Sequence, residues 1–267
     1  MKKYISVLRI RFLNGLQYRA AALGGLATQF AWGGMLVLLY RAFYQADPAQ
    51  FPMTMQQTAS YIWLQQAFLA LLMNWHMDGE PFEMISNGNI AYELTRPISL
   101  YGLWFMRNVG LRASRAALRC LPVMLFAMLL PAPYGLALPP LSWRLPAFVL
   151  SMAMAMCLAI SVAMLEYAAS FWTISAQGVR IVTQTACDLL SGQLLPIPFM
   201  PPALQFVVKL LPFGYMQDVP LRRYSGSLSG WEAAGQMGAQ AAWLAAMVAL
   251  GMWMMRRALK RVVAQGG

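Results

Sequence analysis

Few residues in this chain could do chemistry, and their spacing sets up no catalytic site. No GxxxxGK[ST] motif occurs, so the chain lacks a phosphate-binding loop for hydrolysing ATP. A metal-dependent hydrolase would need a ligand set such as HExxH, but His76 is the only histidine. The cysteines lie in apolar stretches without CxxC spacing, which indicates packing residues. We therefore expect no catalytic residue, no metal site and no cofactor bound by this chain.

Three titratable residues lie within or beside long apolar stretches. Asp188 is placed deepest, roughly 12 Å along a helix from Arg180. A carboxylate in a bilayer is costly, so it indicates either a transport pathway or a structural hydrogen bond to a neighbouring helix, and the sequence leaves both open. Glu166 is interpreted as an ordinary charge at the level of the lipid headgroups. His76 is interpreted as an interfacial side chain with a tip that reaches water.

The elements that position these residues are predicted to be membrane-spanning helices. Apolar residues make up 60% of the 267 residues and charged residues 11%, against roughly 45–50% and 25% in an average soluble domain. The apolar residues come in continuous runs of about 20, long enough to cross the hydrocarbon layer of a bilayer. Strands of a transmembrane barrel would alternate polar and apolar residues instead. The predicted fold class is an all-α integral membrane protein.

Six apolar runs define the spans of a single transmembrane domain over residues 1–267. The spans are expected at residues 20–40, 61–75, 116–130, 145–167, 179–195 and 231–255. Residues 1–19 are predicted to form an amphipathic helix, since a cleavable signal would have a shorter charged region and a shorter apolar core. Residues 77–100 are too polar for lipid. Residues 196–230 hold an apolar piece too short to span, among prolines and glycines, which predicts a re-entrant segment.

The distribution of basic residues predicts the orientation. With the N-terminus inside, the alternating inner segments hold every Lys and Arg except Arg41, Arg144, Lys209, Arg222 and Arg223. Because basic residues favour the cytoplasmic side, both termini and residues 77–100 are expected in the cytoplasm, and residues 196–230 outside. The net charge of +11 therefore reflects membrane topology, and no nucleic-acid partner is expected.

Two segments resemble a known family. Residues 85–98, ISNGNIAYELTRPI, resemble the Ile-x-x-Gly-x-(Ile/Leu)-x-x-x-Leu-x-Arg-Pro signature between the second and third spans of ABC-2-type permeases, in the subgroup of uncharacterised ABC export permeases. Residues 210–226, LLPFGYMQDVPLRRYSG, resemble the Leu-Pro-Phe-x-Tyr-Met segment before the last span in that subgroup. The resemblance extends over essentially the full chain. Tyr92, Glu93 and Thr95 depart from it, because more apolar or basic residues are expected there.

The resemblance implies a type V exporter-like membrane subunit in a bacterial cytoplasmic (inner) membrane. Its partners would be a separate nucleotide-binding ATPase, which holds ATP and Mg, a second permease that is identical or related, and membrane lipids. A coupling helix over residues 82–96 would dock on the ATPase, with Gly88 allowing a turn and Pro97 ending the helix. The coupling residues are expected to be Phe82, Glu83, Ile85, Gly88, Glu93, Leu94, Arg96 and Pro97.

The residue types of that segment are themselves compatible with docking. Exposed Glu83, Glu93 and Arg96 beside apolar side chains would form a mixed surface typical of interfaces. The alternative is an amphipathic helix that lies on the inner leaflet. Its acidic content argues against this alternative, because anionic lipids attract basic faces.

The expected activity is export of a hydrophobic or amphipathic substrate, such as a lipid, drug or peptide. The polar contacts of the substrate path are expected to be Trp63, Gln65, Gln66, Asn74, Gln184 and Asp188. The extracellular gate is expected at Pro196, Pro198, Pro201, Pro202, Pro212 and Phe213. Small residues at four-residue spacing let helices approach closely in lipid, which fits either packing within the chain or a dimer interface at Gly24, Gly238 and Ala242.

A protein of a different class is the alternative: an ion-coupled secondary transporter with Asp188 as the coupling carboxylate. Such transporters usually carry interrupted helices in both halves of an inverted repeat. Here interruption is evident only near residues 196–230. A membrane enzyme or an assembly scaffold is disfavoured because the chain lacks a catalytic set.

Overall fold

The computed structural model describes residues 2–17, 19–47, 51–138, 144–173 and 175–261. All regular structure in these residues is helical, so the expected all-α fold is confirmed. The elements in chain order are α1 (Lys2–Leu16), α2 (Arg19–Ala46), α3 (Met55–Ala67), α4 (Leu69–Leu72), η2 (Asn74–His76), α5 (Glu80–Ser86), α6 (Ile90–Leu94), α7 (Leu100–Leu129), α8 (Arg144–Ala169), α9 (Ala176–Leu190), η3 (Ile197–Phe199), α10 (Pro202–Lys209), α11 (Gly214–Ser225) and α12 (Gly230–Leu259).

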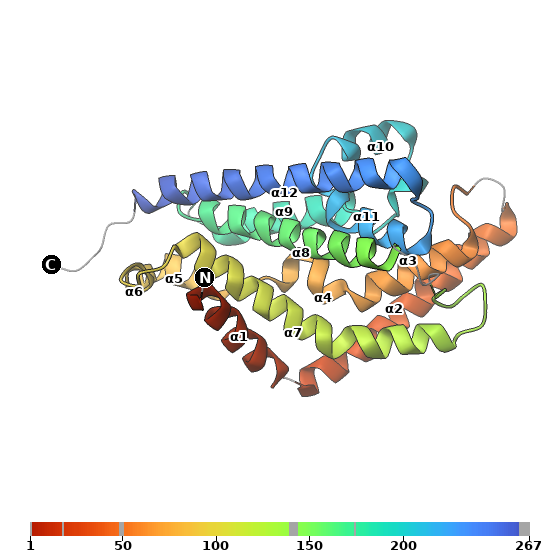
Figure 1. Ribbon diagram of the computed structural model, residues 1–267, viewed down its shortest axis with the longest axis horizontal. Coiled ribbons are helices and arrows are strands. Elements are labelled where there is room, and N and C mark those ends of the chain that lie inside the picture. Colours follow the sequence, from red (N-terminus) through yellow and green to blue (C-terminus); the bar gives the residue numbers. More distant parts are fainter. Residues whose placement is uncertain (1, 18, 48–50, 139–143, 174, 262–267) are drawn as a thin grey trace.

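The long helices form an elongated bundle around α8. Helices α7, α8 and α12 run roughly along the long axis, and α1 begins at the same end of the molecule where α12 finishes (Figure 1). Helices α5 and α6 lie at that end too, while α10 lies toward the opposite end (Figure 1). Helix α8 packs against α7, α9, α11 and α12, and α2 packs against α3 and α7. The centre of the bundle therefore holds elements from both halves of the chain.

Local sequence signals explain where several helices begin and end. Helix α3 begins with a capping box, because the Thr54 hydroxyl accepts from the Gln57 backbone N–H and the Gln57 side chain accepts from the Thr54 N–H. The Ser99 hydroxyl caps α7 by accepting from the Gly102 N–H. Gly226, with φ +80°, ends α11.

Three of the expected spans differ from the helices that form. The second is interrupted at Phe68, where α3 ends and the short α4 begins. The third starts earlier than expected, at Leu100, because Arg107 and Arg112 are buried within α7 and do not stand in a loop before it. The fifth stops at Leu190, because Gly192 turns the chain in the left-handed region with φ +89°. A Cβ at Gly192 would lie 2.7 Å from the Tyr61 hydroxyl, so the position requires glycine.

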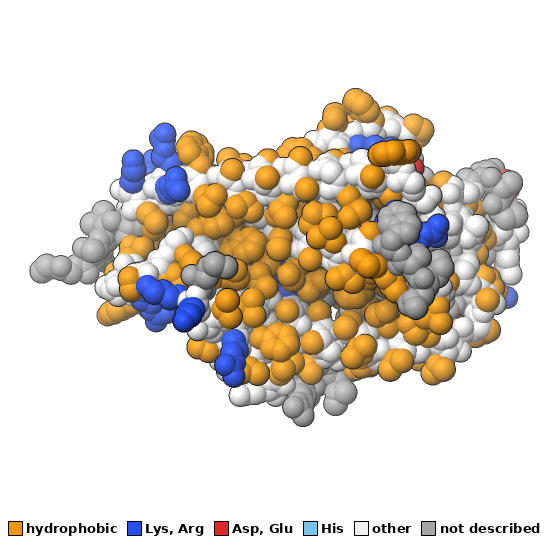
Figure 2. Space-filling view, viewed as in Figure 1, with side chains coloured by type: hydrophobic (Ala, Val, Ile, Leu, Met, Phe, Trp, Pro, Cys, Tyr) orange, Lys and Arg blue, Asp and Glu red, His pale blue; other side chains and the backbone are white. Residues whose placement is uncertain are grey.

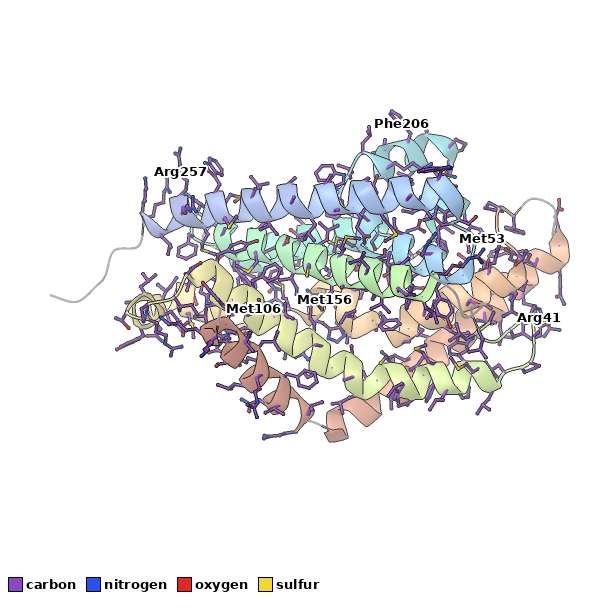
Figure 3. All side chains as sticks on the ribbon, in the orientation of Figure 1. Arg41, Met53, Met106, Met156, Phe206 and Arg257 are labelled. Atoms are coloured by element: carbon purple, nitrogen blue, oxygen red, sulfur yellow. The ribbon has the colours of Figure 1, made fainter. Side chains whose placement is uncertain are left out.

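Residues 196–230, expected as a re-entrant segment, contain η3, α10 and α11. Helix α11 is buried along most of its length between α3, α8 and α12. Helix α10 is more exposed, and Phe206, which is 66% exposed, points outward from it (Figure 3).

The surface is divided by residue type along the long axis. Figure 2 shows apolar side chains over the middle of the bundle and Lys and Arg gathered near the end where α12 finishes. The exposed basic residues at that end include Lys2, Lys3, Arg9, Arg256, Arg257 and Lys260. Arg41 and Arg257 lie toward opposite ends (Figure 3). An apolar belt beside a basic end is typical of a protein surrounded by lipid.

Two described helices, α8 and α12, are long and apolar enough to cross a membrane by length and composition. They differ in environment, because 61% of the apolar window is buried in α8 and 17% in α12. Helix α12 therefore presents most of its apolar surface to the surroundings. Exposed apolar side chains also cover α2, where they include Trp32, Met35, Leu38, Leu39 and Phe43.

Replacing Gln240 with Leu is expected to loosen the packing of α8, α11 and α12. The Gln240 side chain is 0% exposed, and its amide donates to the carbonyls of Ser151 and Tyr215 at 3.0 and 2.9 Å. Losing these bonds should lower the stability by roughly 1–3 kcal/mol, measured as a lower unfolding temperature in detergent. Gln236→Leu, one turn away and half-buried, is the matched control and should have little effect. Equal losses in the two variants would contradict this role of Gln240.

Candidate functional site

The polar segment between α4 and α7 folds into two short helices joined by a tight turn. Gly88 lies between α5 and α6 with φ +72°, a conformation that glycine adopts without strain. The predicted turn at Gly88 is therefore confirmed. The predicted single helix over residues 82–96 is wrong, because this turn divides it and α6 ends at Leu94, before Pro97.

The α5–α6 pair has a buried side and an exposed side. Phe82 packs edge-on against the Tyr167 ring at a centroid distance of 4.8 Å, and Ile90 is buried. Glu93 is 5% exposed and pairs with Arg96 at 3.2 Å, so the expectation that Glu93 is exposed is wrong. Tyr92 is 74% exposed and was not among the expected contact residues.

The remaining expected coupling residues divide in the same way. Ile85 is half-buried, and the exposed ones are Glu83, Gly88, Leu94, Arg96 and Pro97. The carbonyl of Pro97 accepts a hydrogen bond from the Lys3 ammonium at 3.0 Å, which ties the end of the segment to α1.

A partly buried ion network holds the α5–α6 pair to the bundle. Arg107 of α7 is 4% exposed and donates through Nε to Asp78 at 3.1 Å. The same guanidinium pairs with Glu80, and Glu80 also pairs with Arg11 of α1. The Asn108 side chain accepts from the Asp78 N–H at 3.0 Å. These bonds join α1, α5 and α7, and we call Arg11, Asp78, Glu80, Arg107 and Asn108 the brace.

Helix α8 is joined to the brace through Tyr167. Its hydroxyl donates to the Asp78 carbonyl at 2.5 Å and lies beside the Asn108 amide. The sequence does contain a signal for the brace. Two acidic residues, Asp78 and Glu80, follow the second span, and the arginines of α7 have no acidic residue near them in the sequence. Pattern reasoning placed those arginines outside the span and so gave them no partners.

The electrostatics of the brace favour an ionised Glu80. Burial is the largest single influence and raises the pKa of Glu80. The hydrogen bond from Arg11 and the charge of Arg107 together outweigh burial, so the pKa of Glu80 lies below its ordinary value.

Two further arginines of α7 bind backbone carbonyls around the interruption of the second span. The Arg112 guanidinium, 0% exposed, donates to the carbonyls of Leu71 and Met73 at 3.0 and 2.9 Å. Arg115 donates to the His76 carbonyl at 2.8 Å. His76 is itself buried and stacks on Trp75, so the expectation of a histidine tip in water is wrong.

Glu166 lies inside the bundle, and the expectation of a headgroup-level charge is wrong. Glu166 is 2% exposed, and one of its carboxylate oxygens accepts a hydrogen bond from the Asn74 amide. Asn74 was expected on a substrate path, and the structure makes it the partner of this carboxylate. Periodicity could not reveal the pair, because the two residues are 92 positions apart.

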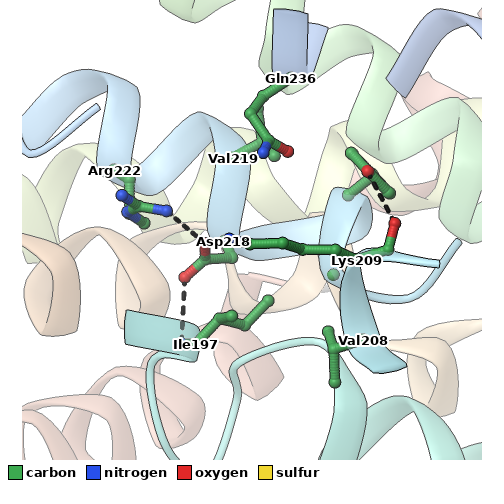
Figure 4. A pocket seen from close by; sticks show the side chains of 9 residues that line it. Ile197, Val208, Lys209, Asp218, Val219, Arg222 and Gln236 are labelled. Carbon is green, nitrogen blue, oxygen red and sulfur yellow. Dashed lines mark hydrogen bonds and ion pairs between the residues drawn. The ribbon is translucent and has the colours of Figure 1, made fainter. Parts of the chain in front are cut away.

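A second buried cluster lies toward the opposite end, around Asp218 of α11. Its carboxylate accepts from the Tyr61 hydroxyl at 3.3 Å. It also accepts from the Ile197 N–H at 3.3 Å and from Arg222 at 3.4 Å (Figure 4). A cavity of about 20 Å³ beside it is lined by Asp218 and Lys209 among others, which is room for one water molecule. The cluster joins α3 to residues 192–197 and α11. Its sequence signal was the Asp–Arg spacing of four within a helix.

The structure does not gather the expected path residues around one opening. Trp63, Gln65 and Gln66 are buried in α3, where Trp63 donates to the Tyr134 carbonyl at 2.9 Å and Gln65 to the Gln193 carbonyl at 2.6 Å. Gln184 and Asp188 lie half-buried on α9. Asp188 forms no ion pair within the described ranges. The choice between a transport pathway and a structural bond to a neighbouring helix therefore stays open for this residue.

The expected gate and dimer residues are placed as follows. Pro196 and Pro212 are buried, Pro198 and Phe213 half-buried, and Pro201 and Pro202 exposed. Gly24 and Gly238 are exposed, and an added Cβ at either would meet no atom within 4 Å. Ala242 is exposed as well. These three small residues are therefore not used for close helix packing within the described part of the chain.

An all-helical bundle with an apolar belt and a basic end is the architecture of a multi-pass membrane protein. The chain matches the family described as ABC-2 family transporter protein over residues 30–266 and belongs to it. It is thus an integral membrane protein, the transmembrane component of an ABC transporter and not itself the ATPase. Members of this family normally work with an ATP-binding subunit. No curated protein and no solved structure matches the chain.

Removing the central cation of the brace is expected to destabilise the protein. Arg107→Met leaves the carboxylates of Asp78 and Glu80 near each other without their shared partner, which should cost roughly 3–5 kcal/mol. The measurement is the unfolding temperature in detergent, together with the rate of trypsin cleavage between α5 and α7. Arg9→Met removes an exposed arginine of α1 and is the control. Unchanged stability in Arg107→Met would show that the brace contributes little.

The brace is also expected to respond to acid. A lowered pKa of Glu80 means that its carboxylate stabilises the fold at neutral pH and that this contribution is lost as the pH falls through the folded-state pKa, below the ordinary 4.5. Glu80→Gln should therefore lower the unfolding temperature at neutral pH and flatten its decline in acid. Glu232→Gln, an exposed carboxylate 59% accessible at its side chain, should retain the wild-type profile. Parallel acid profiles for Glu80→Gln and wild type would contradict the assignment.

Proposed function

We propose that this chain is the membrane subunit of an ATP-driven exporter that moves a hydrophobic or amphipathic substrate across a bacterial cytoplasmic membrane. The observation that carries the proposal is the α5–α6 pair, which is exposed on one side and fixed to the bundle by the brace on the other. A surface that receives motion from an ATPase needs both properties. It must be accessible to the partner, and it must not move independently of the helices that it drives.

The docking surface is formed by the exposed residues of the α5–α6 pair. Tyr92 and Leu94 are 74% and 42% exposed, and the exposed polar residues of the same segment include Asn89, Thr95 and Arg96. A large aromatic residue within a polar rim is a frequent anchor in protein interfaces. Phe82 and Glu93, expected among the coupling residues, are buried and would position the pair rather than touch the ATPase.

The brace provides the route by which docking would move the bundle. A push on α5 reaches α7 through the Glu80–Arg107 pair and α8 through the contact of Phe82 with Tyr167. Arg107 also pairs with Asp78 at 3.0 Å, and both of these side chains are largely buried. Such a pair resists displacement, because separating it leaves uncompensated charge in an apolar interior. Rigid-body rocking of the helices between inward and outward access is the motion that this arrangement would transmit.

The proposed topology has six spans, formed by α2, α3 with α4, α7, α8, α9 and α12. Both termini and the α5–α6 pair lie in the cytoplasm, in keeping with the basic residues at that end and the positive-inside bias. Residues 196–230 form an external re-entrant segment, and the prolines around η3 and α10 act as its gate. A second permease subunit packs on the chain, with Gly24, Gly238 and Ala242 as the first positions to test by cross-linking.

Placing a charge at Tyr92 is expected to release the ATPase without unfolding the membrane subunit. Tyr92→Asp puts a carboxylate at the centre of the docking surface, and retention of a candidate ATP-binding subunit should fall roughly tenfold. The measurement is co-purification in detergent, with the unfolding temperature of the membrane subunit recorded in parallel. Leu138→Asp is the matched control, because Leu138 is also 74% exposed but lies beyond the far end of α7.

The outcomes of this experiment distinguish the proposed docking surface from the proposed exporter function. Loss of the ATPase in Tyr92→Asp alone supports the α5–α6 docking surface. Equal retention in both variants places the docking surface elsewhere. If the wild-type chain retains no ATP-binding subunit from any source tested, the exporter proposal fails.

A further inference from the structure

A cavity of about 270 Å³ lies between α8, α9 and α12, apart from the α5–α6 pair and the brace. Its lining is mainly apolar and includes Val162, Leu165, Val179, Met247 and Met254. Leu165, Val179 and Met254 are only half-buried, so the cavity reaches the apolar outer surface of the bundle. A molecule dissolved in the surrounding lipid could therefore enter it sideways.

One carboxylate interrupts this apolar lining. Glu166 lines the cavity and is 2% exposed, and its Oε1 is occupied by the Asn74 amide. Its Oε2 is buried and has no hydrogen-bond partner among the described residues. Leaving a buried carboxylate oxygen without a donor is costly, so a polar acceptor of this kind inside an apolar cavity indicates a place for a ligand.

The charges that face Glu166 decide what the missing partner is. Arg112 of α7 and Arg180 of α9 act on the carboxylate electrostatically, but neither forms an ion pair with it in the described structure. Arg112 is engaged with two backbone carbonyls, and Arg180 lies over the Phe82 ring at 5.2 Å. The negative charge therefore already has cations nearby. What the Oε2 atom lacks is a hydrogen-bond donor close enough to touch it.

We infer that this cavity binds an amphipathic molecule with an apolar chain and a small donor head group, an amine or a hydroxyl, which donates to Oε2 of Glu166. The apolar chain lies along the side chains from α8, α9 and α12. An ionised carboxylate head group is disfavoured, because it would place an acceptor and a second negative charge against the carboxylate of Glu166. Glu166 lies three residues before the end of α8, in the half of the bundle that carries the α5–α6 pair.

This inference rests on the proposed function in one respect: the bound molecule is the class of substrate that the exporter takes up from the cytoplasmic half of the bilayer. The location fits such loading. Helix α9, which forms one wall of the cavity, makes most of its helix contacts with α8. A wall with few neighbours can move without disturbing the core of the bundle.

The test is photolabelling of the chain in phosphatidylcholine vesicles, without any ATPase. The probe is dodecylamine with a diazirine in its alkyl chain, and the labelled positions are mapped by peptide mass spectrometry. Unlabelled dodecylamine, dodecanol and dodecanoate then compete with the probe. We expect labels on α8, α9 and α12 that dodecylamine and dodecanol displace and dodecanoate does not.

Variants separate the carboxylate from the apolar walls. Glu166→Gln puts an amide where the acceptor was and should weaken labelling by dodecylamine about tenfold. Val179→Trp fills the cavity from its half-buried rim, leaves Glu166 in place, and should abolish labelling there even if Glu166→Gln fails to fold. Glu232→Gln is the control and should be labelled as the wild type is.

Two results would overturn the inference: equal competition by all three compounds, or labelling that is the same in Val179→Trp and wild type. Because no ATPase takes part, failure here leaves the docking surface untouched. Likewise, if the chain fails to co-purify with an ATPase, the result of the labelling experiment is unaffected.

Discussion

The interruption of the second span imposes the constraint on which the rest of the structure depends. Where α3 and α4 give way to an extended residue at Met73, backbone carbonyls lose their helical partners inside an apolar bundle. Each such group would cost several kcal/mol in lipid without a donor. Arg112 supplies a donor to the Leu71 carbonyl and a second donor, beside the His76 N–H, to the Met73 carbonyl. A fully buried arginine is thereby held in the middle of α7, and the helices around it must pack so that its charge and the interruption stay together.

Helix α7 has a polar face as a consequence. The arginines along it face the interrupted span and the acidic residues that follow, so that one helix serves both the interior and the α5–α6 pair. Arg112 binds backbone at the interruption, Arg115 binds the His76 carbonyl, and Arg107 holds the two carboxylates of the brace. The arginines of α7 therefore both stabilise the interrupted span and connect it to the surface proposed to dock on the ATPase.

The two ends of the bundle use the same principle with different partners. Toward one end, Glu166 of α8 meets Asn74 beside the interrupted span. Toward the other, Asp218 of α11 meets Tyr61 of α3 and the backbone of residue Ile197. In each case one buried carboxylate fixes a helix against an irregular segment. The difference is that the carboxylate of Asp218 is bonded at both oxygens, whereas Glu166 keeps one oxygen open toward a cavity. Similar residues thus hold the fold at one end and leave room for a ligand at the other.

The sequence by itself determined the class of protein, because the length and continuity of apolar runs reflect the solvent in which the chain must fold. It also determined the turn at Gly88, since a left-handed backbone conformation favours glycine, and the region of the α5–α6 pair, since so polar a segment cannot enter lipid. Only the tertiary structure decided which charges are buried. Glu166 and His76 were expected in water, and Arg107 and Arg112 outside the span, because sequence patterns assign a charge to the surface unless its partner is a near neighbour. Their partners lie on other helices or across the fold, and the distance in space between such residues is set by packing, which no local pattern records.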